Sequence, residues 1–201
     1  MPPHKRSQVR GPAVRDELVM AADELFTAKG AGNVGVDEIA ATSGIAKSTL
    51  YRWFPTKDDL VVAYLRRRDA AFWQVWDTIA ADHAGRPADE LIAQLEWIRD
   101  YIAMPEFRGC PFLNITAEFA DAGHRARTAA QINKVELRRR LTTLAEQLGI
   151  TDPPALADQL VLVVDGAFAT SQVFGADGPQ NHLVEAGRAL ISVHLGATQN
   201  G

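Results

Sequence analysis

The sequence contains very little cysteine and has no long apolar run. Its single cysteine, Cys110, excludes an intrachain disulfide and a cysteine-rich zinc site. No apolar run approaches the roughly 18–20 residues that cross a membrane. The stretch 1–15 is polar and lacks the apolar segment of a secretory signal. These absences predict a cytoplasmic protein with no membrane partner.

Strand patterns are also scarce, because no run of alternating apolar and polar residues is bounded by turns. The 201 residues are 47% apolar and 23% charged, which is typical of a globular protein with a sizeable core. Apolar residues recur instead at helical spacing along most of the chain. The sequence therefore predicts an all-α fold of about nine helices, over residues 12–29, 36–43, 47–53, 57–84, 87–103, 112–121, 125–148, 155–174 and 181–195.

The net charge of −4 is unevenly distributed along the chain. Residues 1–70 carry 11 Lys and Arg against 9 Asp and Glu, whereas residues 71–201 carry 10 against 16. The basic excess begins in the N-terminal tail with Lys5, Arg6 and Arg10. Such a tail is either a solvated chain end or a segment that follows DNA phosphates. The chain thus has a mildly basic front and an acidic rear.

Residues 36–53 have the spacing of a helix-turn-helix. Gly44 suits a sharp turn that requires a positive φ, and the small Ala40 allows the two helices to approach closely. Apolar residues occupy the contact positions of the second helix: Ile45, Leu50 and Trp53. Its other side chains point outward and suit phosphates and base edges: Lys47, Ser48, Thr49, Tyr51 and Arg52.

This segment resembles the DNA-binding domain of the tetracycline-repressor (TetR) family of bacterial regulators. The resemblance covers about residues 14–65 and is most specific over 45–57, which reads IAKSTLYRWFPTK. It implies a homodimer in which residues 1–56 bind double-stranded operator DNA. Residues 57–201 would bind a small apolar or aromatic effector and dimerise. The implied function is a transcriptional repressor, released from DNA by its effector, and not an enzyme.

The resemblance also implies roles for individual residues at the DNA. Base-edge or phosphate contacts fall to Lys47, Ser48, Thr49 and Arg52, and a phosphate contact falls to Tyr51. Lys57 would place its ammonium, with the first amides of the fourth helix, on the DNA backbone. The family usually has Thr where this chain has Gly35, so any phosphate contact there must come from backbone N–H. We expect Trp53 to be partly buried.

The rear is rich in aromatic residues at helical spacing, which indicates either a plain core or an apolar cavity between helices. We expect an effector cavity to be lined by Trp73, Trp76, Trp97, Tyr101, Phe107, Cys110, Asn114, Glu118, Phe168 and Gln172.

The break at residues 105–112 resembles a Gly-Cys-x-x-x-Asn turn found in some members of the family. Asn114 and Glu118 follow it and form either a polar spot in the effector pocket or a hinge in which they satisfy loop backbone. Cys110 is either a small buried side chain or a redox and electrophile sensor, because a reactive thiolate requires a nearby cation or helix N-terminus. Thiol-based sensing is thus an alternative mode of regulation.

The last two helices are strongly apolar, and the resemblance assigns them to the dimer interface. The residues expected there are Leu160, Val164, Ala167, Leu183, Leu190 and Ile191. The basic run 138–140 is expected on a solvated helix face, paired with Glu136 and Glu146.

Two other classes of function were weighed: an enzyme and a helical adaptor that contacts proteins. An enzyme would have to use Cys110 with His124, or Glu118 as a base. The sequence contains no nucleophile, base and orienting group at an informative spacing, and no phosphate-binding glycine loop. The five histidines show no metal spacing, so no metal or other cofactor is expected.

Overall fold

A computed structural model of the protein describes residues 11–199, which form nine α-helices, two short 3₁₀ helices and no strand. The predicted all-α class is confirmed. The α-helices are α1 (Pro12–Lys29), α2 (Val36–Ser43), α3 (Lys47–Trp53), α4 (Lys57–Asp82), α5 (Pro87–Ile102), α6 (Pro111–Glu118), α7 (Arg125–Gln147), α8 (Pro153–Phe174) and α9 (Leu183–Gln199). The 3₁₀ helices η1 (Gly175–Asp177) and η2 (Pro179–His182) join α8 to α9. The predicted basic tail with Lys5, Arg6 and Arg10 lies outside the described residues.

Local sequence explains how the front helices begin and end. Gly44 ends α2 with φ 69° and ψ 14°, the left-handed conformation that the turn motif requires. Thr56 begins α4 through a capping box. Its hydroxyl accepts a hydrogen bond from the Asp59 amide at 3.1 Å, and the Asp59 carboxylate accepts one from the Thr56 amide at 3.1 Å.

Several predicted helix boundaries differ from the structure by two to four residues, the largest difference being at the end of α9, which reaches Gln199 and not residue 195. The helix expected to reach residue 121 ends at Glu118, because Phe119 is extended and its ring stacks on His124 with centroids 4.2 Å apart. The helix expected to begin at residue 181 is preceded there by η2, and α9 begins at Leu183.

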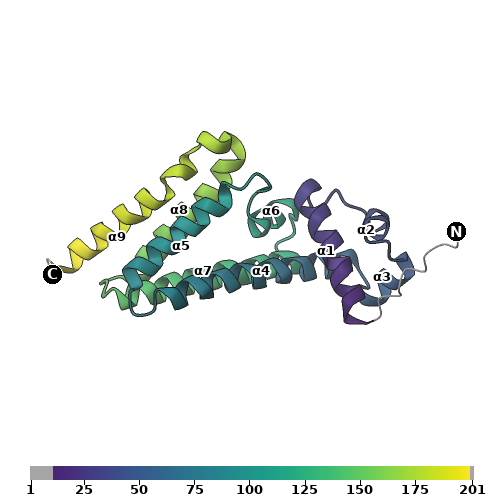
Figure 1. Ribbon diagram of the computed structural model, residues 1–201, viewed down its shortest axis with the longest axis horizontal. Coiled ribbons are helices and arrows are strands. Elements are labelled where there is room, and N and C mark those ends of the chain that lie inside the picture. The colour runs from purple at the N-terminus through teal and green to yellow at the C-terminus, as the bar shows by residue number, and fades with distance from the viewer. Residues whose placement is uncertain (1–10, 200–201) are drawn as a thin grey trace, which may run out of the picture.

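The front helices α1, α2 and α3 lie together at one end of an elongated molecule (Figure 1). Leu18, Ile39 and Leu50 are fully buried between them. α4 leaves this end and runs beside α7 toward the other end, where α5, α8 and α9 lie (Figure 1). A single rigid helix therefore connects the front to the rear.

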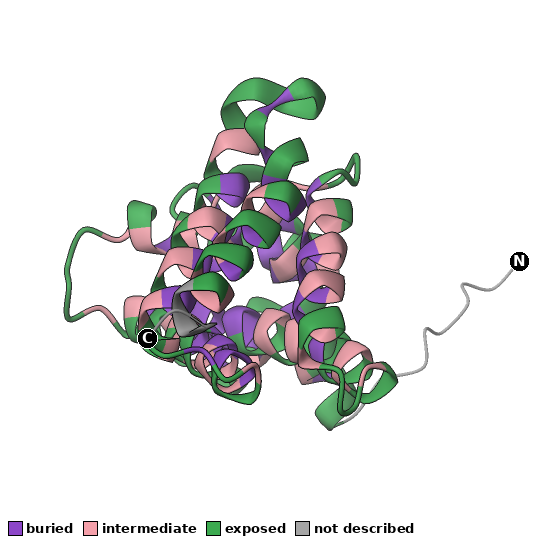
Figure 2. Ribbon diagram, turned by 90° about the vertical axis from the view of Figure 1, so that its left-hand side faces the viewer, coloured by how far each residue is buried: buried purple, intermediate pink, exposed green. Residues whose placement is uncertain are grey.

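The rear core is built by α5, α7, α8 and α9, whose buried residues face one another (Figure 2). It contains most of the side chains that were expected at the dimer interface. Five are buried within one chain: Leu160, Val164, Ala167, Leu183 and Ile191. The sixth, Leu190, is half-buried. α9 and α5 cover this side of α8 inside the protomer, so these five side chains pack within one chain.

The exposed apolar side chains of the same two helices are different ones. Leu162 and Val173 of α8 are 72% and 77% exposed, and Phe174 of α8 and Val193 of α9 are also exposed. By length and composition alone, the stretch Pro153–Asp177 is apolar enough to cross a membrane, a test that the core helix of a soluble protein also passes. The protomer thus presents an uncovered α8–α9 apolar face, defined by Leu162, Val173, Phe174 and Val193.

The basic run on α7 is paired largely as predicted. Arg139 and Arg140 both bond Glu136, and hydrogen bonds led by that from Arg139 lower the pKa of this carboxylate to about 2. Arg138 pairs with Asp158 of α8 instead of Glu146. The run therefore joins α7 to its neighbour as well as facing solvent.

Candidate nucleic-acid interface and ligand cavity

The outer side of α3 is a surface of hydrogen-bond donors. Lys47, Ser48, Tyr51 and Arg52 are exposed, and Thr49 is half-buried, while Leu50 on the opposite side is fully buried. The buried Leu50 thus fixes α3 so that its five donor side chains face outward. Such a surface has the size and chemistry to enter a major groove.

Trp53 is partly buried, as expected, with an exposed fraction of 39%. It follows the buried Leu50 by three residues and therefore lies at the edge between the buried and the outer sides of α3. The next residue, Phe54, is 3% exposed. The chain becomes extended at Phe54, with φ −131°, and this turns the Phe54 ring into the core beneath the guanidinium of Arg15.

Asp37 of α2 forms an ion pair with Lys47, one of the donors of α3. The Lys47 ammonium lies 2.7 Å from the Asp37 carboxylate, and this hydrogen bond raises the pKa of Lys47. The lysine stays protonated at any ordinary pH. A DNA phosphate would therefore compete with Asp37 and not with water alone.

The start of α2 lacks a side-chain cap. Gly35 is the N-cap residue with φ −87°, and no side-chain hydrogen bond is made there. A Cβ added at Gly35 would meet no other atom within 4 Å. Lys57, the first residue of α4, is half-buried beside the capping box. Gly35 and Lys57 thus lie at the starts of two helices, as the sequence predicts.

Three polar contacts join this front to the loop around α6. The Gly32 amide donates to Glu118 Oε2 at 2.7 Å. At the start of α4, His124 Nε2 lies 3.1 Å from Asp58 Oδ2. The neighbouring pair, Arg125 and Asp59, is 2.6 Å apart. The α6–α7 region therefore touches both the loop after α1 and the first turn of α4.

Of the two interpretations of Asn114 and Glu118, the hinge describes their hydrogen bonds. Glu118 accepts from loop backbone, and Asn114 Nδ2 donates to the Arg108 carbonyl at 2.9 Å. Gly109 in the bend has φ +91°, and a Cβ added there would lie 2.7 Å from Gln172 Nε2 and 3.0 Å from the side-chain amide of Asn114. Asn114 thus stabilises the bend before α6, whereas the Glu118 carboxylate ties the end of α6 to the loop after α1.

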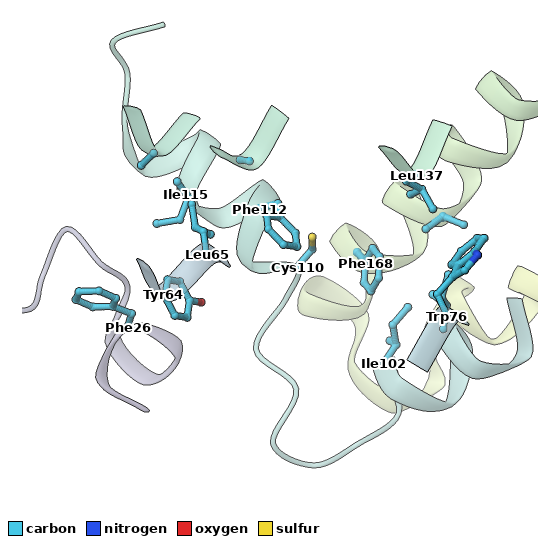
Figure 3. Close-up of a cluster of buried hydrophobic side chains, with 14 of the residues drawn as sticks. Phe26, Tyr64, Leu65, Trp76, Ile102, Cys110, Phe112, Ile115, Leu137 and Phe168 are labelled. Atoms are coloured by element: carbon cyan, nitrogen blue, oxygen red, sulfur yellow. The ribbon is translucent and has the colours of Figure 1, made fainter. Parts of the chain in front are cut away.

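A cavity of about 270 Å³, here called the inner chamber, lies between α4, α5, α6, α7 and α8. Aromatic rings form much of its wall: Phe72, Trp97, Tyr101, Phe112 and Phe168. Figure 3 shows Cys110 between Phe112 and Phe168, with Leu137 beyond them. Arg68, Asn133 and Lys134 supply its polar edge. The chamber suits a small, mostly apolar molecule.

A second cavity of about 290 Å³, the outer chamber, lies next to it toward α1. Phe26 and Tyr64, whose rings meet edge to face at 5.5 Å, line it together with Asn114 and Glu118. Burial raises the pKa of Tyr64 to about 12, so its hydroxyl stays neutral. The two chambers share four lining residues: Arg68, Tyr101, Met104 and Pro111.

Seven of the ten predicted cavity residues line one of these chambers. Trp97, Tyr101, Cys110 and Phe168 line the inner one, and Tyr101, Phe107, Asn114 and Glu118 line the outer one. Three do not line either. Trp76 is buried in the core, Trp73 donates to Asp69 beneath the Arg140 guanidinium, and Gln172 contacts the bend at Gly109.

Arg68 and Lys134 are the charged residues of the inner chamber that were not predicted from the sequence. Arg68 belongs to a run of three arginines, but it follows Tyr64 by four residues and so shares the buried side of α4. Lys134 is 2.5 Å from Asp165 of α8, and its ammonium lies 5.4 Å from the Phe168 ring centroid. The spacing of Arg68 from Tyr64 could have predicted its place in the chamber wall. The pairing of Lys134 with Asp165 depends on how α7 packs against α8 and could not be predicted from spacing.

Cys110 is buried at the edge of the inner chamber. Burial raises the pKa of its thiol, and the positive charge of Lys134 offsets this only in part. The thiol is therefore protonated at neutral pH. Between residues 11 and 199, no three His, Cys, Asp or Glu side chains gather as a metal site would require.

Comparison with known proteins agrees with this architecture. A model of the family described as "Bacterial regulatory proteins, tetR family" matches residues 18–64. The structure of SCO4454, a TetR-family transcriptional regulator from Streptomyces coelicolor, superposes with a TM-score of 0.86 at 30% identity. That match covers 90% of this chain and 96% of SCO4454.

Two curated relatives match over shorter stretches. An HTH-type transcriptional regulator of Mycobacterium tuberculosis is 31% identical over 93 residues, which is 44% of this chain and 46% of that protein. The HTH-type transcriptional repressor NemR of Escherichia coli is 24% identical over 116 residues, which is 57% of this chain and 58% of NemR. The chain thus spans about half the length of these curated relatives. With the nearly complete match to SCO4454, it belongs to the TetR family of bacterial transcriptional regulators.

Proposed function

We propose that this regulator is a homodimeric repressor that binds operator DNA through α3 and the start of α4. The observation that carries the proposal is the row of donors on α3, held outward by the buried Leu50 and the left-handed turn at Gly44. Its DNA-contacting residues are Lys47, Ser48, Thr49, Tyr51, Arg52 and Lys57, with the backbone amide of Gly35. The relationship to the repressor NemR supports repression.

The partner that we propose for the α8–α9 apolar face is a second copy of this chain. Leu162 and Val173 are about three helical turns apart and therefore lie on one side of α8. Uncovered apolar side chains of this size are costly in water. Pairing two copies would cover them and place two α3 helices on one DNA duplex. The α3 helices must then be about 34 Å apart, or a multiple of this spacing.

Release from DNA would begin in the inner chamber. Arg68, Phe72 and Val75 of α4 line it, and the same helix begins at Lys57 beside the DNA surface. A ligand that favours another position of α4 would change the spacing of the two α3 helices. The ligand favours the released state only to the extent that it binds that state more tightly than the DNA-bound state.

The direct test is a gel shift with the DNA upstream of the protein's own gene, at increasing salt concentration. A dimer that binds by phosphate contacts should show sequence-preferring retardation that weakens steeply with salt. Binding that shows no sequence preference would remove the proposal and favour the adaptor. The thiol-sensing alternative is not favoured, since burial keeps Cys110 protonated.

A further inference from the structure

We infer that the effector is a small aromatic carboxylate whose carboxylate binds Arg68 and displaces Asp23 of α1. This inference rests on the proposed function, because it names the ligand class of the inner chamber and the contact through which the ligand acts. Arg68 is the residue on which it depends, because its side chain lines both chambers.

The guanidinium of Arg68 has both a paired terminal nitrogen and a buried, unpaired donor, which a ligand reaches once the guanidinium turns away from Asp23. One terminal nitrogen lies 2.5 Å from Asp23 Oδ1 and donates to Thr27 Oγ1 at 2.7 Å. Its Nε is buried and has no hydrogen-bond acceptor among the described residues. A buried donor without an acceptor is costly, and a guanidinium can bind a carboxylate through two parallel hydrogen bonds. A ligand carboxylate would satisfy this donor.

The wall of the inner chamber has the complementary character. Its charged lining residues are Arg68 and Lys134, and none of the described side chains that line it is a carboxylate. Asp165 already pairs with Lys134 at 2.5 Å, so Lys134 has a fixed anionic partner on a neighbouring helix. The rings of Phe72 and Trp97, whose centroids are 4.8 Å apart, favour a flat apolar body. A ligand cation would find no counter-charge in this wall.

The position of Asp23 connects this ligand to the DNA surface. Asp23 and Thr27 lie on α1 of the front, whereas Arg68 lies on α4. A carboxylate bound at Arg68 would compete with Asp23 and weaken a contact between the two helices. The same competition works in reverse, because coupling between two binding equilibria is reciprocal. Removing the Asp23 charge should therefore strengthen ligand binding.

The test uses the full-length protein and isothermal titration calorimetry with cinnamate, and with cinnamyl alcohol as its neutral counterpart. Cinnamate should bind the unmodified protein more tightly than the alcohol does. Arg68→Gln should weaken cinnamate binding by about 10- to 100-fold, the range for a lost hydrogen bond to a charged group. The matched control is Arg67→Gln, because Arg67 lies 3.5 Å from the same Asp23 but does not line the inner chamber. It should leave cinnamate affinity within about twofold.

Asp23→Asn provides a second variant of nearly unchanged shape, should Arg68→Gln fail to fold. It should tighten cinnamate binding by about threefold or more and leave cinnamyl alcohol unaffected. The inference is overturned if the alcohol binds as well as cinnamate, or if Asp23→Asn weakens cinnamate binding. It is also overturned if Lys134→Met removes cinnamate binding while Arg68→Gln does not.

Operator binding, measured separately by fluorescence anisotropy, distinguishes this inference from the proposed function. A protein that binds DNA but shows no preference for cinnamate contradicts the ligand class alone. If cinnamate binds through Arg68 and no operator binding occurs, the ligand class stands and the proposed function fails.

Discussion

The two ends of the molecule use their charged side chains in opposite ways. At the front, α3 holds Lys47 and Arg52 on an exposed surface, where Lys47 also pairs with Asp37 of α2. In the rear, Arg68 and Lys134 border a ring-lined chamber, where their side chains are less exposed and each pairs with a carboxylate from another helix. An exposed row of donors suits a long polyanion, whereas partly buried charges beside aromatic rings suit one small ligand. Among the described residues, the two sites are connected through α4, through its contacts with α1, and through the contacts of the α6–α7 region with α4 and with the loop after α1.

The largest effect is expected from a substitution in the α8–α9 apolar face. If operator DNA must be bound by two α3 helices, losing the dimer also weakens DNA binding. Leu162→Glu should convert the dimer to a monomer and weaken operator binding by about 100-fold or more, since each half-site then binds alone. Analytical ultracentrifugation measures the first effect and anisotropy the second. Ile132→Glu is the matched control, because Ile132 is 62% exposed but lies on α7. An unchanged dimer in Leu162→Glu would exclude this face.

The second prediction concerns the reactivity of Cys110 in the rear. Because burial raises the pKa of its thiol, labelling by a thiol reagent at pH 8 should be about 100-fold slower in the folded protein than in urea. The rate in the folded protein should rise as the pH is raised, since the thiolate is the reacting form. Mass spectrometry measures both rates. Equal rates in the folded and unfolded chain would restore the thiol-sensing alternative.

A smaller effect is expected from one charge at the front. Lys57→Ala should weaken binding to all DNA sequences by about tenfold and reduce the slope of log affinity against log salt by about one, as the loss of one phosphate contact does. Arg86→Ala removes the same charge at the start of α5 and should change neither quantity. Identical salt slopes for Lys57→Ala and the unmodified protein would contradict the phosphate role of Lys57.

The front could be predicted from sequence far better than the rear, for a physical reason. The turn at Gly44 and the outward residues of α3 depend on local spacing, so 47–53 was predicted to the residue. Most of the residues predicted at the dimer interface pack inside the protomer instead, because α8 is apolar on several sides and periodicity cannot tell which side its own chain covers. The pairing of Arg68 with Asp23 and Thr27 joins α4 to α1 and has no local pattern. Sequence spacing cannot predict ion pairs between residues that come together only in the folded chain.

The smallest effect is expected at Gly35, where the family usually has threonine. Gly35→Thr places a hydroxyl at the N-cap of α2, where no side-chain cap exists and no atom lies within 4 Å of the added Cβ. The backbone there, with φ −87° and ψ 156°, is one that threonine adopts without strain. Thermal unfolding should show a gain of only a few tenths of a kcal/mol, because glycine is itself a fair N-cap. Operator affinity should rise by more than this gain explains, since the hydroxyl can also donate to a phosphate. Gly123→Thr, at an exposed loop position in the rear, gives the background for a glycine replaced away from the DNA. If Gly35→Thr raises stability but leaves operator affinity unchanged, the start of α2 does not touch the phosphate backbone, and the interface is confined to α3 and α4.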